Sequence, residues 1–159
     1  MVAERGSEGL THRAVATAAG VPLGSTTYHF ADREEMLEAA MLEAAADTER
    51  TLRAWADAVK PEDDLVDALV DLLVSDSSER RETIVVAYEL YLAALKRPAL
   101  RPAALKWSVS LRVQLERFVD PLSAAALATA ADGILIAGLA SGTSVDPEAA
   151  AAILRRVER

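Results

Sequence analysis

The stretch from residue 9 to residue 31 contains side chains suited to contact with a nucleic-acid backbone. It carries imidazole, guanidinium, phenol and hydroxyl groups, and it contains neither Asp nor Glu, although the whole chain has a formal net charge of −8. Cations and hydroxyls bind phosphate oxygens and the base edges exposed in the major groove. The stretch is therefore locally basic, and it is the candidate DNA-reading surface of an acidic chain.

Other chemistries are poorly supplied by this composition. The chain has no Cys and only two His, which excludes thiolate sites and disfavours zinc binding and His-based catalysis. No nucleophile–base pair can be assembled from its residues, so we expect no enzymatic activity, no metal and no cofactor. The glycine-containing run 133–142 has no Lys and follows no strand, which argues against a phosphate-binding loop.

Two short helices are expected to position the candidate DNA-reading residues. Thr11 is a good N-cap for a helix over 11–19, and Gly20 can adopt the left-handed conformation that ends it. Pro22 then blocks continuation, and a second helix over 23–29 follows. Two short helices joined by a tight turn containing Gly form a helix-turn-helix. The second helix is rich in small hydroxyl residues that stability alone would not select.

The remainder of the chain predicts further helices and no strands. Apolar residues at three- and four-residue spacing indicate a long helix over 32–59, in which Asp32 is the N-cap and Glu35 completes a capping box. Similar patterns predict helices over 62–74 and 79–97, after Pro102, after Pro121, and from Asp146 onward. Ala and Leu make up about a third of the chain, and both are strong helix formers. The fold class is therefore all-α.

The segments after Pro102 and Pro121 are apolar around their whole circumference, so we expect them to be the most buried. Residues 122–140 could pass for a membrane span by length. Asp132 would be costly in the middle of a bilayer, and much of the segment is Ala, Gly and Ser. We therefore favour a buried helix in a soluble bundle, and we expect no membrane partner.

The chain from Gly9 to Leu37 resembles the TetR family of transcriptional repressors. Gly9-Leu10-Thr11-His12-Arg13 matches the family's starting pattern GLTxR. Gly20-Val21-Pro22-Leu23-Gly24-Ser25-Thr26-Thr27-Tyr28-His29-Phe30, followed by Asp32-Arg33-Glu34-Glu35, looks like its recognition helix and the entry into its long fourth helix. Glu89-Leu90-Tyr91 ahead of Arg97-Pro98, and Ala131-Asp132-Gly133-Ile134-Leu135, look like signposts of the family's ligand domain.

The resemblance implies a helix-turn-helix head over 1–46, continuing into the helix 32–59, and a helical-bundle body over 47–159 that binds an effector and dimerises. It implies that Thr11 and Arg13 contact phosphate, that Tyr28 and His29 hold the DNA backbone, and that Arg33 takes a flanking phosphate. The full DNA-binding set that it implies is Thr11, His12, Arg13, Leu23, Gly24, Ser25, Thr26, Thr27, Tyr28, His29 and Arg33. Thr27 departs from the pattern, because an aromatic residue is common there.

The family places another helix before Gly6, and here only Val2-Ala3-Glu4-Arg5 corresponds to its end. Without that helix, Leu10, Val15, Val21 and Phe30 would lose one wall of their small core. Exposing an apolar side chain of this size costs roughly 1.5–3 kcal/mol. We therefore expect the first thirty residues to be less ordered than the rest, and we expect this chain to bind DNA weakly or not at all.

Five large residues with polar tips are candidates for an effector site in the body: Trp55, Tyr88, Glu89, Tyr91 and Trp107. An apolar pocket with a few placed polar groups suits a small hydrophobic ligand. The alternative is an ordinary core in which each aromatic residue makes one hydrogen bond. Glu89 is the strongest candidate, because a carboxylate on an apolar helix requires a partner. That partner could equally be Arg97 or Arg112.

Small and apolar residues near the end of the chain are candidates for a two-fold interface of four helices, as in the family: Leu111, Leu115, Phe118, Ala130, Ala131, Ile134, Ala137 and Gly138. The alternative is burial within the core of a monomer. Together these features predict a cytoplasmic, ligand-responsive repressor that binds a palindromic operator in double-stranded DNA as a homodimer. The alternative function is a dimeric helical module that binds a small molecule and has lost DNA binding together with its first helix.

Overall fold

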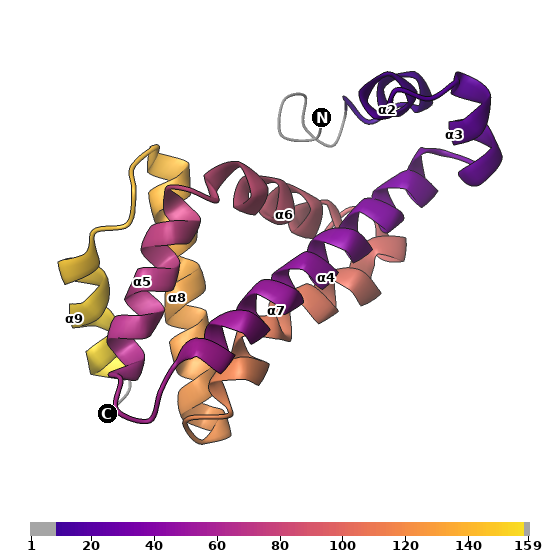
Figure 1. Ribbon diagram of the computed structural model, residues 1–159. Coiled ribbons are helices and arrows are strands. Elements are labelled where there is room, and N and C mark those ends of the chain that lie inside the picture. The colour runs from indigo at the N-terminus through magenta and orange to yellow at the C-terminus, as the bar shows by residue number, and fades with distance from the viewer. Residues whose placement is uncertain (1–8, 158–159) are drawn as a thin grey trace. The chain divides into compact units, whose positions relative to one another are not determined.

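The computed structural model describes residues 9–157, and the regular elements of that part of the chain are all helical (Figure 1). The elements are α2 (His12–Ala19), α3 (Leu23–His29), α4 (Arg33–Ala58), α5 (Leu65–Ser77), α6 (Arg81–Ala93), the 3-10 helix η2 (Pro98–Leu100), α7 (Arg101–Leu115), α8 (Pro121–Ser141) and α9 (Pro147–Val157). The predicted all-α class is confirmed.

The turn between α2 and α3 forms as its sequence predicts. The Thr11 hydroxyl oxygen accepts a hydrogen bond from the Ala14 amide at 3.2 Å and caps α2. Gly20 has φ 67°, the left-handed conformation that is cheap for glycine, and the Val21 amide donates to the Ala16 carbonyl at 3.0 Å. The two helices pack against each other as a helix-turn-helix.

Helix α4 starts with the predicted capping box. Asp32 Oδ1 accepts from the Glu35 amide at 3.0 Å, and Glu35 Oε2 accepts from the Ala31 amide at 2.5 Å. The reciprocal bond therefore reaches one residue further back than the usual box. These bonds satisfy amides at the helix start, and they fix the direction in which α4 leaves the head.

The later helix ends differ in part from the predicted ones. Helix α5 begins at Leu65 instead of residue 62, since Asp64 is the N-cap and accepts from the Asp67 amide. Helix α6 ends at Ala93 instead of residue 97, and the chain turns there into η2. Asp120 caps α8 through the amides of Leu122 and Ser123.

The chain divides into two compact units. The first comprises Met1–Asp47 and Val85–Ser108, so the later part of α6 and the first part of α7 share a unit with the head and the first half of α4. The largest fully buried side chains of this unit are Leu37, Met41, Leu90 and Leu100. The division in α4 falls beside the predicted boundary at 46/47, but the grouping of 85–108 with the head has no counterpart in the predicted domains.

The second unit comprises Thr48–Ile84 and Val109–Arg159, and in it α5, α8 and α9 pack side by side (Figure 1). Leu69, Leu73, Leu127 and Leu154 form the centre of its core. A buried hydrogen bond from the Val145 amide to Ser77 Oγ, 2.9 Å long, joins the end of α5 to the loop after α8.

Helix α8 is less buried than its composition predicted. Only 33% of its most apolar 18-residue window is buried, and Leu122 is 80% exposed. Helix α5 is more enclosed, with seven of its 13 residues buried. The expectation that α8 would be among the most buried helices is therefore wrong, because residues 9–157 leave one face of α8 uncovered. By length and composition alone α8 could cross a membrane, a test that core helices of soluble proteins also pass.

Candidate functional site

The candidate DNA-reading surface is formed by α3 and the start of α2. Tyr28 is 85% exposed, and Leu23, Gly24, Thr27 and His29 are also exposed. A tyrosine this open has given up the packing that normally holds an aromatic ring. The exposed side of α3 is thus open to solvent, while Ser25 is partly covered.

Thr26 does not belong to that surface. Its side chain is 5% exposed, and its hydroxyl donates to the Leu23 carbonyl at 2.9 Å and lies 3.3 Å from the His12 carbonyl. The assignment of Thr26 to DNA contact is therefore corrected: it joins α3 to α2. A buried hydroxyl needs such a partner, and the sequence alone does not reveal which threonine of the pair faces inward.

The residues expected at the start of α2 lie differently from one another. Thr11 and Arg13 are exposed, so the Arg13 guanidinium is accessible to phosphate. His12 is partly covered, and its Nδ1 is buried with no hydrogen-bond partner in the described part of the chain. This imidazole is thus turned at least partly into the head, away from a DNA surface.

Arg33 connects α4 to the head. Its Nε donates to the Leu10 carbonyl at 3.2 Å, and the residue is partly buried. The sequence predicted that Arg33 would contact a flanking phosphate. The observed bond gives its guanidinium an internal partner that the sequence pattern did not indicate.

Three of the predicted effector residues form one cluster in the first unit. The rings of Tyr88 and Trp107 are 5.0 Å apart at 79°, and those of Tyr91 and Trp107 are 4.9 Å apart at 41°. Edge-to-face and tilted contacts at these distances are favourable. Helices α6 and α7 therefore meet through a packed aromatic cluster.

Glu89 lies next to Tyr88 in sequence, about 100° further around α6. Its Oε2 is buried and has no hydrogen-bond partner within the described residues. Of the two arginines considered as its partner, Arg97 pairs with Glu34 at 3.2 Å, and Arg112 pairs with Glu116 at 3.6 Å. A buried carboxylate oxygen without a donor is uncommon and marks a position where a ligand could supply the missing interaction.

Trp55 lies in the second unit, where its indole N–H already has a hydrogen-bond partner within the chain. Its Nε1 donates to the Ala68 carbonyl at 3.1 Å, and its ring meets that of Phe118 at 6.3 Å. This is the ordinary core environment given above as the alternative for these aromatic residues. Within residues 9–157 no group of three or more His, Asp or Glu is arranged to hold a metal ion.

The residues predicted for the subunit interface are divided between core and surface. Leu115 and Ala131 are 0% exposed, so they pack inside the single chain and offer little to a partner. A Cβ added at Gly138 would meet the Thr143 carbonyl at 3.4 Å, so this glycine allows close packing within the chain. Ala137 and Phe118 are exposed, and Leu111, Ala130 and Ile134 are partly exposed.

The open side of α8 carries a regular stripe that the sequence analysis missed. Its members follow a four- and three-residue spacing, and all but the partly exposed Ala126 are exposed: Leu122, Ala126, Thr129, Gly133, Ile136 and Ala140. A Cβ at Gly133 would meet nothing within 4 Å, so no neighbour in the chain requires this glycine. The heptad-like spacing was the signal that could have identified this stripe.

Comparison with known proteins identifies the family of the chain. A family model described as "Bacterial regulatory proteins, tetR family" matches residues 1–40, and one described as "Tetracyclin repressor-like, C-terminal domain" matches residues 60–159. The chain belongs to the TetR family. It is a ligand-responsive DNA-binding transcriptional regulator, as the sequence predicted. Among curated proteins, none matches the chain.

Several solved structures are similar to this chain over nearly its whole length. The multidrug binding protein EbrR in complex with ethidium is 41% identical, with a TM-score of 0.85 over 98% of this chain and 90% of that one. A TetR-family member from Streptomyces coelicolor A3, SCO1917, gives the same identity, coverage and TM-score. SCO7518 from Streptomyces coelicolor A3(2) is 29% identical, with a TM-score of 0.87 over 99% and 91% of the chains.

EbrR has also been solved with proflavin, with malachite green and with imidazole. For this TetR-family chain, the match over residues 1–40 favours the regulator over a module without a DNA-binding head. The predicted loss of the first helix concerns residues before Gly6, which lie outside the described residues. The head elements that are described, α2 and α3, are formed.

Proposed function

We propose that this chain is a repressor whose effector is a lipophilic aromatic cation bound beside α6. The observation that carries the proposal is the buried, unpartnered Oε2 of Glu89 on the helix that also carries Tyr88 and Tyr91. A carboxylate away from water favours a cation over a neutral ligand, and aromatic faces attract cations as well.

The relatives support this class of effector. EbrR is described as a multidrug binding protein, and three of its bound ligands are ethidium, proflavin and malachite green. All three are aromatic cations whose positive charge is delocalised over their rings. A single carboxylate among aromatic side chains suits such ligands. It attracts the delocalised positive charge of the ligand without requiring that charge to lie at one fixed atom.

On the DNA side, we propose that Arg13, Leu23, Gly24, Thr27 and Tyr28 make the contacts. Their exposure on one helix-turn-helix supports this assignment, and the lack of carboxylates over 9–31 supports it electrostatically. The reading helix would enter the major groove, with phosphate contacts at the start of α2. This activity requires a cytoplasmic location, together with the chromosome, and it requires neither catalysis nor a membrane.

We propose that the stripe on α8 forms the subunit interface of a homodimer. Its small residues permit close approach of a second helix, and Gly133 has open space where a side chain would be. Two heads then face a palindromic operator one helical turn apart. The effector favours a head spacing that does not fit the operator, which shifts the population toward free protein.

Isothermal titration calorimetry with malachite green at pH 7 tests the effector class. We expect Glu89→Gln to weaken dye binding about ten-fold, because it removes the charge that offsets the cation. Glu82→Gln is the matched control, since Glu82 lies exposed in the first turn of the same helix. Leucomalachite green, the uncharged reduced form of the dye, should bind both variants alike.

Equal weakening of both dyes by Glu89→Gln would mean that Glu89 acts through shape and not through charge. A native chain that binds neither dye would contradict the proposed effector class. Malachite green is preferred to ethidium because its twisted rings intercalate poorly, so the same dye serves in experiments that include DNA.

A further inference from the structure

The first turn of α4 holds three consecutive charged side chains with three different partners. Arg33 donates from Nε to the Leu10 carbonyl of the head at 3.2 Å. Glu35 completes the capping box with the Ala31 amide. Glu34, between them, accepts from Arg97 Nε at 3.2 Å. This one turn is therefore attached to the head on one side and to the segment after α6 on the other.

Arg97 is held by a hydrogen-bonded turn between the two helices that carry the aromatic cluster. Its amide donates to the Ala93 carbonyl at 3.1 Å, and it is the N-cap residue of η2, which leads directly into α7. The Arg97 side chain is 18% exposed and that of Glu34 is 51% exposed. Both residues belong to the first unit, as do the head and the rings of Tyr88, Tyr91 and Trp107.

We propose that the Glu34–Arg97 ion pair is the connection that transmits effector binding from α6 and α7 to the DNA-binding head. The inference rests on the proposed function, and it assigns both residues as positioning residues that contact neither effector nor DNA. A single hydrogen bond of 3.2 Å is lost when its atoms separate by a few tenths of an ångström more. A small shift of the α6–α7 turn therefore strengthens or weakens this contact with the first turn of α4.

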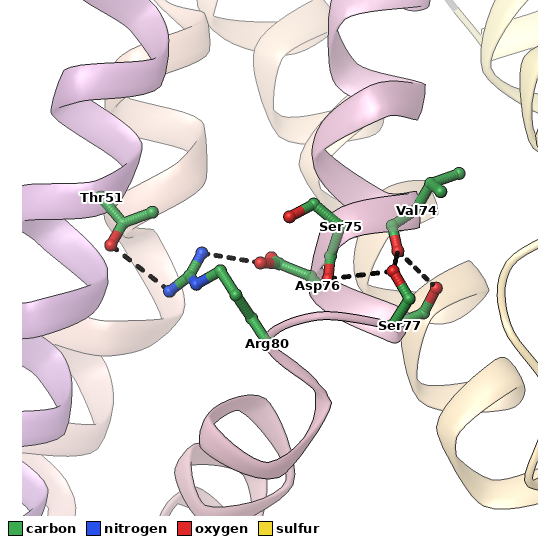
Figure 2. A network of polar contacts seen from close by, with 7 residues as sticks. Thr51, Val74, Ser75, Asp76, Ser77 and Arg80 are labelled. Carbon is green, nitrogen blue, oxygen red and sulfur yellow. Dashed lines mark hydrogen bonds and ion pairs between the residues drawn. The ribbon is translucent and has the colours of Figure 1, made fainter.

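The other end of α6 offers a contrasting attachment in the second unit. Arg80, directly before α6, donates to Asp76 Oδ1 at 2.7 Å and to the Thr51 hydroxyl of α4 at 3.3 Å (Figure 2). Asp76 is buried and Arg80 is mostly covered. This attachment is buried, belongs to a different unit from the head, and provides a control that removes a bond between Arg80 and α4.

The experiment compares the native chain with Glu34→Gln, Arg97→Gln, the double variant and Thr51→Val. Fluorescence anisotropy gives the affinity for labelled DNA from upstream of the chain's own gene, without dye and with saturating malachite green. The ratio of these two affinities measures the coupling between effector and head. Calorimetry gives the dye affinity of each variant separately.

We expect each single variant to reduce the coupling ratio about three-fold with unchanged dye affinity. The double variant should match either single one, because the two substitutions remove the same bond. Thr51→Val should keep the native ratio. A native ratio in both single variants, additive effects in the double variant, or an equal loss in Thr51→Val would each overturn the proposal.

If the native chain does not bind the dye, the proposed effector class is wrong and the connection is judged from DNA affinity alone. Simple electrostatics predicts opposite changes, because Glu34→Gln removes a negative charge and Arg97→Gln a positive one. The proposed connection predicts that both weaken DNA binding and that the double variant weakens it no further. Opposite or additive changes would overturn it.

Discussion

Thr26 and Thr27 are neighbours with the same side chain and opposite environments. The Thr26 hydroxyl is buried between α3 and α2, where it bonds the Leu23 carbonyl. The Thr27 hydroxyl is exposed, and it bonds the Gly24 carbonyl of its own helix at 3.2 Å. One threonine therefore holds the head together and the other is free to face DNA. At the scale of the residue, the function of a hydroxyl depends on which side of a short helix it occupies.

Replacement of each threonine by the isosteric valine separates these two functions. We expect Thr26→Val to destabilise the folded chain by about 1 kcal/mol, because it leaves a buried hydrogen-bonding position unfilled. Thr27→Val should change stability by a few tenths of a kcal/mol at most, since its hydroxyl is open to water. Urea unfolding followed by circular dichroism measures both. Equal losses would show that the head does not depend on the Thr26 bond.

At the scale of the element, the corner between α5 and α6 is a polar joint inside an apolar bundle. Figure 2 shows Arg80 between Asp76 of α5 and Thr51 of α4, while Ser77 bonds the Val74 carbonyl. Arg81, the next residue, donates to the Leu139 carbonyl near the end of α8 at 2.8 Å. The start of α6 is thus fixed to several helices of the second unit by directional bonds.

Removal of the cation at this corner should be costly. We expect Arg80→Met to reduce stability by about 2 kcal/mol, because it leaves the buried Asp76 carboxylate without its charge partner. The double variant Arg80→Met with Asp76→Asn should recover part of this loss, since no unpaired charge remains. Thermal and urea unfolding provide the comparison. A double variant less stable than Arg80→Met would contradict this account of the corner.

The same corner predicts a pH dependence. Burial raises the pKa of Asp76 above its ordinary 3.8, and the Arg80 charge only partly opposes this. The folded state therefore favours the protonated form of Asp76. Protonation of Asp76 contributes fully to the free energy of unfolding below pH 3.8, and this contribution is lost as the pH rises through the raised pKa. We expect the native chain to gain stability relative to Asp76→Asn as the pH falls from 7 to 4. A relative loss on acidification would mean that the pairing with Arg80 outweighs burial.

At the scale of the whole molecule, one face of α8 is not covered by any of the residues that the structure describes. Its stripe of Leu122, Ala126, Thr129, Gly133, Ile136 and Ala140 is apolar or small throughout. A regular apolar stripe exposed to water is typical of an interface between subunits. This explains why α8 combines the most apolar composition of the helices with a modest share of buried residues.

Gly133→Leu is expected to convert a dimer into a monomer. The new side chain would occupy the space that a second helix needs, and its Cβ would meet none of the described residues within 4 Å. Helix content should be retained, because leucine favours a helix interior over glycine by roughly 0.8 kcal/mol. Light scattering after size exclusion gives the mass. Ala54→Leu, on an exposed position of α4, is the control and should leave the mass unchanged. A dimeric Gly133→Leu variant would place the interface elsewhere.

The sequence by itself determined the local structure of this protein. Thr11, Gly20, Asp32 and Pro121 act on amides and carbonyls only a few residues away, so their types and spacing define helix starts and turns without reference to distant parts of the chain. The helix-turn-helix, the long α4 and the all-α class followed from such signals. The sequence also located the segment that carries the hydroxyls and cations of the head, because that segment spans only about 20 residues.

Tertiary structure alone decided which faces and partners the helices use. Glu34 finds Arg97 across 63 residues of sequence, and Arg33 finds the Leu10 carbonyl across 23. The open face of α8 and the inward turn of Thr26 depend in the same way on which helices lie alongside. The sequence of a helix that is apolar on all sides does not show which side its neighbours cover. Burial depends on how the helices pack together and not on the segment alone.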